Sequence, residues 1–135
     1  MARARQIITA EEVVEINRRM LRASGGSFIP PSNFLNPGSL SYILGVLEQR
    51  LFGQEMYPSI QDKAAALGWH IIRNHVFTDT NKRTGIMACA MVLDWGGYPF
   101  LHGWLDADAL ETTLRVADGT CDLPAFTAWV VSRTT

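Results

Sequence analysis

The chain has 135 residues, of which 47% are hydrophobic and 19% charged, and its formal net charge is −1. These values fit one packed domain over residues 1–135 and exclude a disordered acidic or basic chain. A nearly neutral chain has no overall attraction for nucleic acid or anionic lipid, so we expect neither a direct nucleic-acid partner nor a membrane partner. No apolar run follows the basic residues 1–6 or approaches the roughly 18 residues of a membrane span, which favours a cytoplasmic bacterial protein.

The first third of the chain predicts two helices joined by a loop. Thr9 with Glu12 has the spacing of a capping box, and an apolar stripe follows it as far as Gly25-Gly26. Residues 25–36 are rich in Gly, Pro, Ser and Asn and are typical of a loop. Asn36-Pro37 has the pattern of an N-cap followed by proline at the first helical position, so we expect the second helix to begin there.

Four further helices are predicted after this point. Residues 52–58 interrupt the helical pattern and can form a short hairpin, or flap, and Ser59 then begins a helix that we expect to run to about Asn74. A mostly apolar, central helix is predicted to begin between Asn81 and Thr84. Two shorter helices follow Asp106 and Asp122. The sequence therefore predicts a single all-α domain of about six helices.

Residues 75–83, named here the motif loop, combine the groups that phosphoryl transfer requires. The start of a helix binds phosphate through free N–H groups and the positive end of its dipole. Lys82 and Arg83 oppose that dipole, which indicates an anionic ligand, although the residues alone also allow pairing with carboxylates elsewhere. Asp79 can bind Mg²⁺ together with substrate phosphates, and His75 can accept a proton from a hydroxyl. The candidate phosphate-binding residues are Asn81, Lys82, Arg83 and Thr84.

The order His-x-Phe-x-Asp-x-Asn-Lys-Arg-Thr resembles the signature of the Fic/Doc family, and of its Doc (death on curing) toxin branch in particular. The similarity extends to residues 40–52 and 57–65 before the motif loop and to residues 87–97 after it. The resemblance implies a Fic/Doc-like domain with ATP as substrate and Mg²⁺ as cofactor. It also implies the following roles: general base for His75, buried loop anchor for Phe77, Mg²⁺ ligand for Asp79, and phosphate contacts for Asn81, Lys82 and Arg83.

Two positions indicate the branch. In AMP-transferring members of the family the motif resembles His-Pro-Phe-x-x-Gly-Asn-Gly-Arg-x-x-Arg, whereas this chain has Lys82 at the second Gly and Ile86 at the last Arg. In Doc-like members this difference accompanies transfer of the γ-phosphate. Val76 and Thr80 are further departures, and a β-branched Thr80 would be strained if its backbone had to be left-handed.

The resemblance therefore implies a Doc-like toxin that phosphorylates a hydroxyl side chain of elongation factor Tu and blocks translation. Its implied partner is a Phd-like antitoxin whose disordered arm folds into a groove, for which the first helix and residues 25–36 are candidates. Two alternatives stay open: an AMP transferase that modifies a protein hydroxyl, and a catalytically silent module that only binds a partner. Motifs of P-loop proteins, EF-hands and eukaryotic-type kinases are absent.

Overall fold

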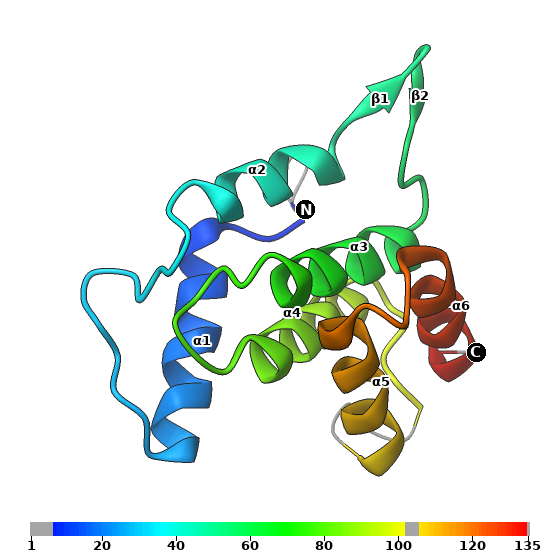
Figure 1. The fold of residues 1–135 in the computed structure, drawn as a ribbon. Coiled ribbons are helices and arrows are strands. Elements are labelled where there is room, and N and C mark those ends of the chain that lie inside the picture. Colours follow the sequence, from blue (N-terminus) through cyan, green and yellow to red (C-terminus); the bar gives the residue numbers. More distant parts are fainter. Residues whose placement is uncertain (1–6, 102–105, 135) are drawn as a thin grey trace.

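The structure, a computed structural model, describes residues 7–101 and 106–134. It confirms the predicted all-α architecture, because these residues form six helices and one small hairpin (Figure 1). The elements are α1 (Ala10–Ser24), α2 (Ser39–Leu47), β1 (Arg50–Leu51), β2 (Gln54–Glu55), α3 (Ile60–Arg73), α4 (Asn81–Trp95), α5 (Ala107–Asp118) and α6 (Leu123–Thr134). None of the helices in the described residues has the length and apolar character that a membrane span requires.

The antiparallel pair α3 and α4 forms the centre of the molecule, and the motif loop connects its two helices (Figure 1). The two helices approach closely because glycines face each other at their crossing. A Cβ atom built on Gly85 would lie 2.7 Å from Ile72 Cγ1 and 2.8 Å from the Gly68 carbonyl oxygen. Real Cβ atoms do not come that close, so this crossing requires glycine.

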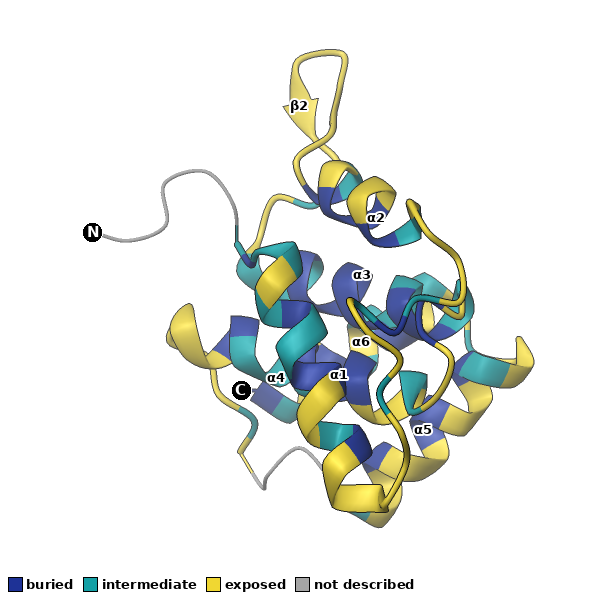
Figure 2. Cartoon of the chain, turned by 90° about the vertical axis from the view of Figure 1, so that its left-hand side faces the viewer, coloured by how far each residue is buried: buried dark blue, intermediate teal, exposed yellow. Residues whose placement is uncertain are grey.

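The other helices pack around this pair. Helix α1 contacts α4, α2 lies over α3, and α5 and α6 cover the opposite side of α3 (Figures 1 and 2). The buried hydrophobic residues form one cluster, and Figure 2 shows buried residues on both central helices. Its largest fully buried members include Phe77, Phe126, Leu40, Ile43, Leu67, Ile71, Ile86 and Leu93. The motif loop therefore connects to the best-packed part of the fold.

Capping interactions fix two of the helix starts as predicted. At α1 the Glu12 amide donates to Thr9 Oγ1 at 3.2 Å, and the Thr9 amide donates to Glu12 Oε1 at 2.8 Å. Ser59 and Asp62 form the equivalent capping box at α3. Each box satisfies two N–H groups that a helix start otherwise leaves without partners.

The start of α2 was predicted wrongly. The helix begins at Ser39, with Gly38 as its N-cap in the left-handed region at φ 89°, and Pro37 precedes the helix. The Asn36 side chain does not cap α2, because its Nδ2 donates to the carbonyl oxygens of Asn74 and His75 at 3.0 and 2.9 Å. A tertiary contact with the motif loop thus replaces the local cap that the sequence pattern suggested.

The interrupted segment forms an antiparallel hairpin that projects from the helical body, slightly earlier in the chain than the predicted 52–58 (Figures 1 and 2). Phe52 and Gly53 make its two-residue turn, both with positive φ, and Phe52 is 97% exposed. Lys63 holds the base of the hairpin. Its buried Nζ donates to Glu55 Oε1 at 2.8 Å, to the Leu47 carbonyl at 3.2 Å and to the carbonyl of Tyr57.

Candidate active site

Phe77 attaches the motif loop to the core. Its side chain is fully buried and stacks on Phe34, with ring centroids 5.6 Å apart. Phe34 and Phe77 also form an isolated antiparallel bridge, and the Leu35 amide donates to the Val76 carbonyl at 2.9 Å. The segment 25–36 thus pairs with the motif loop through backbone as well as side-chain contacts.

Asn81 closes the loop on itself. Its Oδ1 accepts from the Phe77 amide at 2.9 Å, and its Nδ2 donates to the Phe77 carbonyl at 2.8 Å. The first residue of α4 is therefore bonded to the middle of the loop that precedes it. Within the described residues Asn81 Nδ2 makes no second hydrogen bond, and the phosphate contact of Asn81 stays a prediction.

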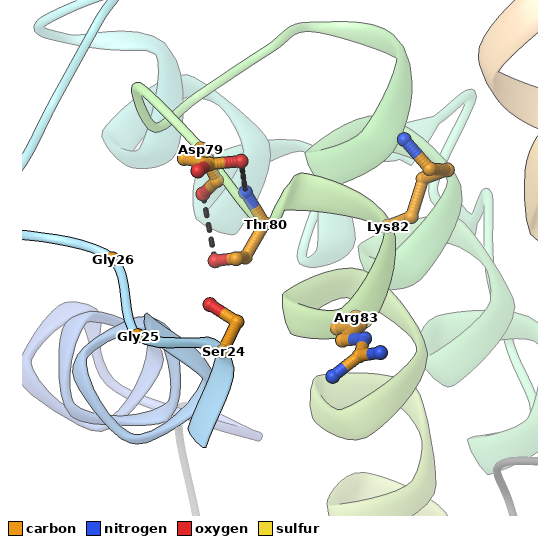
Figure 3. A pocket seen from close by; sticks show the side chains of 7 residues that line it. All are labelled: Ser24, Gly25, Gly26, Asp79, Thr80, Lys82 and Arg83. Carbon is orange, nitrogen blue, oxygen red and sulfur yellow. Dashed lines mark hydrogen bonds between the residues drawn. The ribbon is translucent and has the colours of Figure 1, made fainter. Parts of the chain in front are cut away.

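The backbone of Thr80 is left-handed, which is the strained case for a β-branched residue. It adopts the left-handed conformation, with φ 58° and ψ 31°, immediately before α4. Such a conformation costs a non-glycine residue on the order of 1–3 kcal/mol and persists only where surrounding contacts fix it. Here the Thr80 amide donates to Asp79 Oδ1 and the Thr80 hydroxyl to the Asp79 carbonyl, both at 2.7 Å (Figure 3).

A pocket of about 400 Å³ lies between the end of α1 and the start of α4. Figure 3 shows the residues that line it: Ser24, Gly25, Gly26, Asp79, Thr80, Lys82 and Arg83. Among residues 7–101 and 106–134, neither the Lys82 nor the Arg83 side chain has a hydrogen bond or ion pair, and both residues are exposed. The alternative in which these cations pair with carboxylates elsewhere is therefore not observed in the described chain.

The start of α4 leaves its donors open. Thr80 occupies the N-cap position without a side-chain cap, and no acidic residue stands in the first turn. The positive end of the helix dipole thus lies at the pocket that Lys82 and Arg83 line, and the two side chains extend in different directions from the first turn (Figure 3). This arrangement lowers the stability of an empty helix start and suits an anion.

Asp79 is the one carboxylate among the lining residues of this pocket. Its Oδ1 is used by the Thr80 amide, whereas Oδ2 has no hydrogen bond within the described residues and lies near Gly26. The described residues contain no group of three His, Cys, Asp or Glu side chains that could hold a metal ion without further ligands. A single free carboxylate oxygen fits Mg²⁺ bound jointly with substrate phosphates.

His75 lies at the other end of the motif loop, next to Asn74, the C-cap of α3, and it is exposed. It is not one of the residues that line the pocket. Its backbone has φ 47°, and its carbonyl accepts from Asn36 Nδ2. The structure thus brings Asp79, Lys82 and Arg83 to one pocket and leaves the exposed His75 outside the residues that line it.

Thr84 and Arg73 do not face this pocket. Thr84 is fully buried, and its hydroxyl accepts from Asn17 at 3.1 Å. Arg73, which is close to the loop in sequence, donates to the carbonyls of Val116 and Ala117 at 3.3 and 3.1 Å and so caps the end of α5. The local basic cluster is therefore Lys82 and Arg83, without Arg73.

Two site residues were missed by the sequence analysis, namely the buried asparagines Asn17 and Asn33, which bond to the motif loop. Asn17 did carry a signal: it stands four residues after Val13 and four before Leu21, at a core position of an amphipathic helix. A polar residue there needs a buried partner. Nothing local identified the partner, because the motif loop is more than 60 residues away.

The fold and the site together, six helices with this motif between the two central ones, can be compared with known protein families. The family model described as "Fic/DOC family" matches residues 7–93, and the chain belongs to this family. Over 79 residues it is 38% identical to "Toxin Doc" of Mycolicibacterium smegmatis (strain ATCC 700084 / mc(2)155), which supports the Doc branch. The match covers 58% of this chain and 60% of that protein, so the aligned part spans less than two thirds of the curated relative.

Proposed function

We propose that the protein is a Doc-like toxin of a toxin–antitoxin system that acts as an ATP-dependent protein kinase. It transfers the γ-phosphate of ATP to a hydroxyl side chain of elongation factor Tu and so blocks translation. The observation that carries this proposal is the pair Lys82 and Arg83, which stand without counter-ions in the described chain beside Asp79 at the open start of α4.

In this proposal the phosphates of ATP lie against the start of α4. Lys82, Arg83 and the free amides of the first turn hold them, with Asn81 as a further donor. Asp79 Oδ2 contributes to holding Mg²⁺, which when bound neutralises charge on the phosphates. His75 takes the proton of the target hydroxyl as that oxygen bonds to the γ-phosphorus, and the bond to the bridging oxygen breaks to release ADP.

The choice of γ-phosphate transfer over AMP transfer rests on two positions. Lys82 stands where AMP-transferring relatives have the Gly that lets phosphates approach the backbone closely. Ile86 stands where they have a second Arg, and here this side chain is 1% exposed within the core. One added cation and one missing cation favour a different placement of the triphosphate. AMP transfer is the second candidate.

The hairpin offers a docking site for the protein substrate. Its strand residues are exposed, and Phe52 at the tip is 97% exposed. An extended segment of the target can add to such an edge as a further strand. Because Lys63 fixes the base of the hairpin to α2 and α3, the tip projects in a defined direction from the body that carries His75.

A Phd-like antitoxin is the proposed neutralising partner. Three large apolar side chains near the candidate regions are exposed: Ile29 at 57%, Leu35 at 55% and Tyr42 at 63%. An arm that folds as an amphipathic helix would cover such side chains. We therefore expect a short reading frame that encodes this antitoxin immediately next to the gene of this protein.

Labelled ATP tests the proposal directly. Purified protein and elongation factor Tu are incubated with Mg²⁺ and ATP labelled at either the γ- or the α-phosphate. We expect transfer of γ label and none of α label. Transfer of α label would establish the AMP transferase instead.

Amino-acid substitutions distinguish the two transferase hypotheses from a catalytically silent binding module. His75→Ala is expected to abolish label transfer and toxicity, and Lys82→Ala to raise the KM for ATP. Arg19→Ala removes an exposed cation on α1 that pairs only with Glu15 in the described chain, and it serves as the matched control for lost charge. Toxicity that survives His75→Ala unchanged would support the binding module and refute both transferases.

A further inference from the structure

Asn17 is a buried polar residue with an unusual set of contacts. It lies in α1 and is 0% exposed, in a position where an apolar side chain would fit the helix stripe. Its Nδ2 lies 3.0 Å from the Asp79 carbonyl, 3.0 Å from Thr80 Oγ1 and 3.1 Å from Thr84 Oγ1. The two amide protons are thus shared among three oxygens, all in or next to the motif loop.

Asn33 completes the connection from the other side. It is 1% exposed, and its Nδ2 donates to Asn17 Oδ1 at 2.9 Å. Its Oδ1 accepts from the Thr78 hydroxyl at 2.8 Å and from the Ile29 amide at 3.0 Å, and its carbonyl accepts from the Thr78 amide at 3.1 Å. The two asparagines therefore bond to the residues on both sides of Asp79.

The bonds act where the loop most needs support. Thr80 is in the left-handed region, which its β-branched side chain disfavours. Its hydroxyl accepts from Asn17 and donates to the Asp79 carbonyl, and its amide donates to Asp79 Oδ1. Together these contacts fix the direction of the Asp79 carboxylate and leave its Oδ2 toward the pocket.

Asn17, Asn33 and Thr84 form the buried part of this network. Every buried side-chain nitrogen and oxygen atom of the described residues has a hydrogen-bond partner. A satisfied buried network specifies one arrangement, because each alternative leaves a polar atom unpaired in a low-dielectric environment. Asn17 and Asn33 thus fix the conformation of the motif loop, although neither residue lines the pocket.

We infer that Asn17 and Asn33 are positioning residues, which hold Thr80 in the left-handed conformation and thereby aim Asp79 at the Mg²⁺–phosphate complex. This inference rests on the proposed function for the chemistry of the site. The two side chains do not touch the substrate; they act through the motif loop. Their loss should therefore change the alignment of the site more than its affinity for phosphate, which Lys82 and Arg83 retain.

A pair of substitutions at Thr80 tests this with little risk to folding, because this side chain is only partly buried. Thr80→Val keeps the β-branched shape and removes the hydroxyl that Asn17 bonds. Thr80→Gly also removes the hydroxyl but adopts the left-handed region without strain. We expect Thr80→Val to lower kcat for label transfer on the order of 10–100-fold and to raise the half-saturating Mg²⁺ concentration. Thr80→Gly should retain clearly more activity. Equal losses in the two variants would overturn the inference.

Asn17→Leu tests the asparagine itself, with Thr113→Val as the matched control. Thr113 is equally buried, but its hydroxyl donates within α5, to the Leu110 carbonyl. After correction for the folded fraction, Asn17→Leu should lower kcat while the KM for ATP changes little, and Thr113→Val should leave kcat within about twofold. Thr80→Gly added to Asn17→Leu should recover part of kcat. An unchanged kcat and Mg²⁺ dependence in folded Asn17→Leu would refute the positioning role.

A readout without turnover separates this inference from the proposed function. The Thr84 amide donates to the Thr80 carbonyl at 2.9 Å, so its hydrogen exchange reports on the loop. In Asn17→Leu and Thr80→Val this amide should exchange faster while the later amides of α4 do not. If the wild type transfers no label and this change is still seen, the proposed function fails and the loop support stands. If the wild type transfers label and neither exchange nor kcat changes, the inference fails alone.

Discussion

The crossing of α3 and α4 gives the sharpest stability prediction. Gly85→Ala would place a Cβ atom 2.7 Å from Ile72 Cγ1 and 2.8 Å from the Gly68 carbonyl oxygen. The Ile72 side chain can rotate, but the Gly68 oxygen is backbone within a helix and cannot move without separating α3 from α4. Overpacking of this kind costs about 3 kcal/mol, and the better helix propensity of alanine returns about 1 kcal/mol. We expect a net loss of about 2 kcal/mol in the free energy of unfolding.

The same substitution at Gly45 is the matched control. Gly45 lies within α2, is exposed, and has no atom within 4 Å of the position its Cβ would take. Alanine there loses less backbone entropy on folding than glycine and makes no new contact. Gly45→Ala should therefore stabilise the protein by about 0.5–1 kcal/mol.

Urea denaturation gives the free energy of unfolding of both variants and the wild type, and thermal melting gives their Tm, each followed by circular dichroism. For a chain of this size, about 1 kcal/mol corresponds to roughly 3–4 °C in Tm, so Gly85→Ala should melt about 6–8 °C lower and Gly45→Ala about 2–4 °C higher. Because α4 carries the site, Gly85→Ala should also lower label transfer at temperatures where it is fully folded. A Gly85→Ala protein as stable as Gly45→Ala would refute the close crossing.

Three further results are expected. Lys63→Met removes a buried donor from Glu55 and two carbonyls and should cost about 2–3 kcal/mol in urea denaturation; a loss below about 0.5 kcal/mol would contradict the hairpin anchor. Burial lowers the pKa of His70 below its ordinary value of 6.5, so the unfolded chain binds the proton more readily. Stability from this residue is complete above about pH 6.5 and falls as the pH drops below it, and a His70→Gln variant should lose less Tm than the wild type between about pH 7.5 and about pH 5.5. Asp79→Asn should raise the half-saturating Mg²⁺ concentration by at least about tenfold, whereas Asp94→Asn, at an exposed carboxylate near the end of α4, should not; equal effects would argue against a Mg²⁺ ligand at Asp79.

The helix starts were predictable where their signals are local. Thr9 and Ser59 each lie three residues before a carboxylate, and a capping box needs nothing beyond that spacing. Asn36-Pro37 carries an equally local signal but was wrong, since the Asn36 side chain bonds to backbone nearly 40 residues away. A local pattern fails when a tertiary partner competes for the same side chain.

Some features of the motif loop were likewise predictable from local sequence, and others were not. The order of residues in 75–83 predicted the class of site before any fold was known, because it places a carboxylate and two cations at a helix start and a titratable imidazole six residues before that start. The sequence alone predicted that Thr80 would be strained if its backbone were left-handed, but it did not show whether the backbone adopts that conformation. Its support by Asn17 depends on how α1 packs against α4, and no spacing within the chain encodes that contact.

The bonds of the motif loop also limit how far the site can be treated as a module. The nine residues are contiguous and easily transplanted or recognised as a string, but their shape is set by Asn17 in α1 and by Asn33 and Phe34 in the segment before α2. A fragment that starts at α2 would contain every residue of the motif and lack the contacts that fold it. A graft or minimal version of this site should therefore include α1 and the segment before α2 as well as the motif loop.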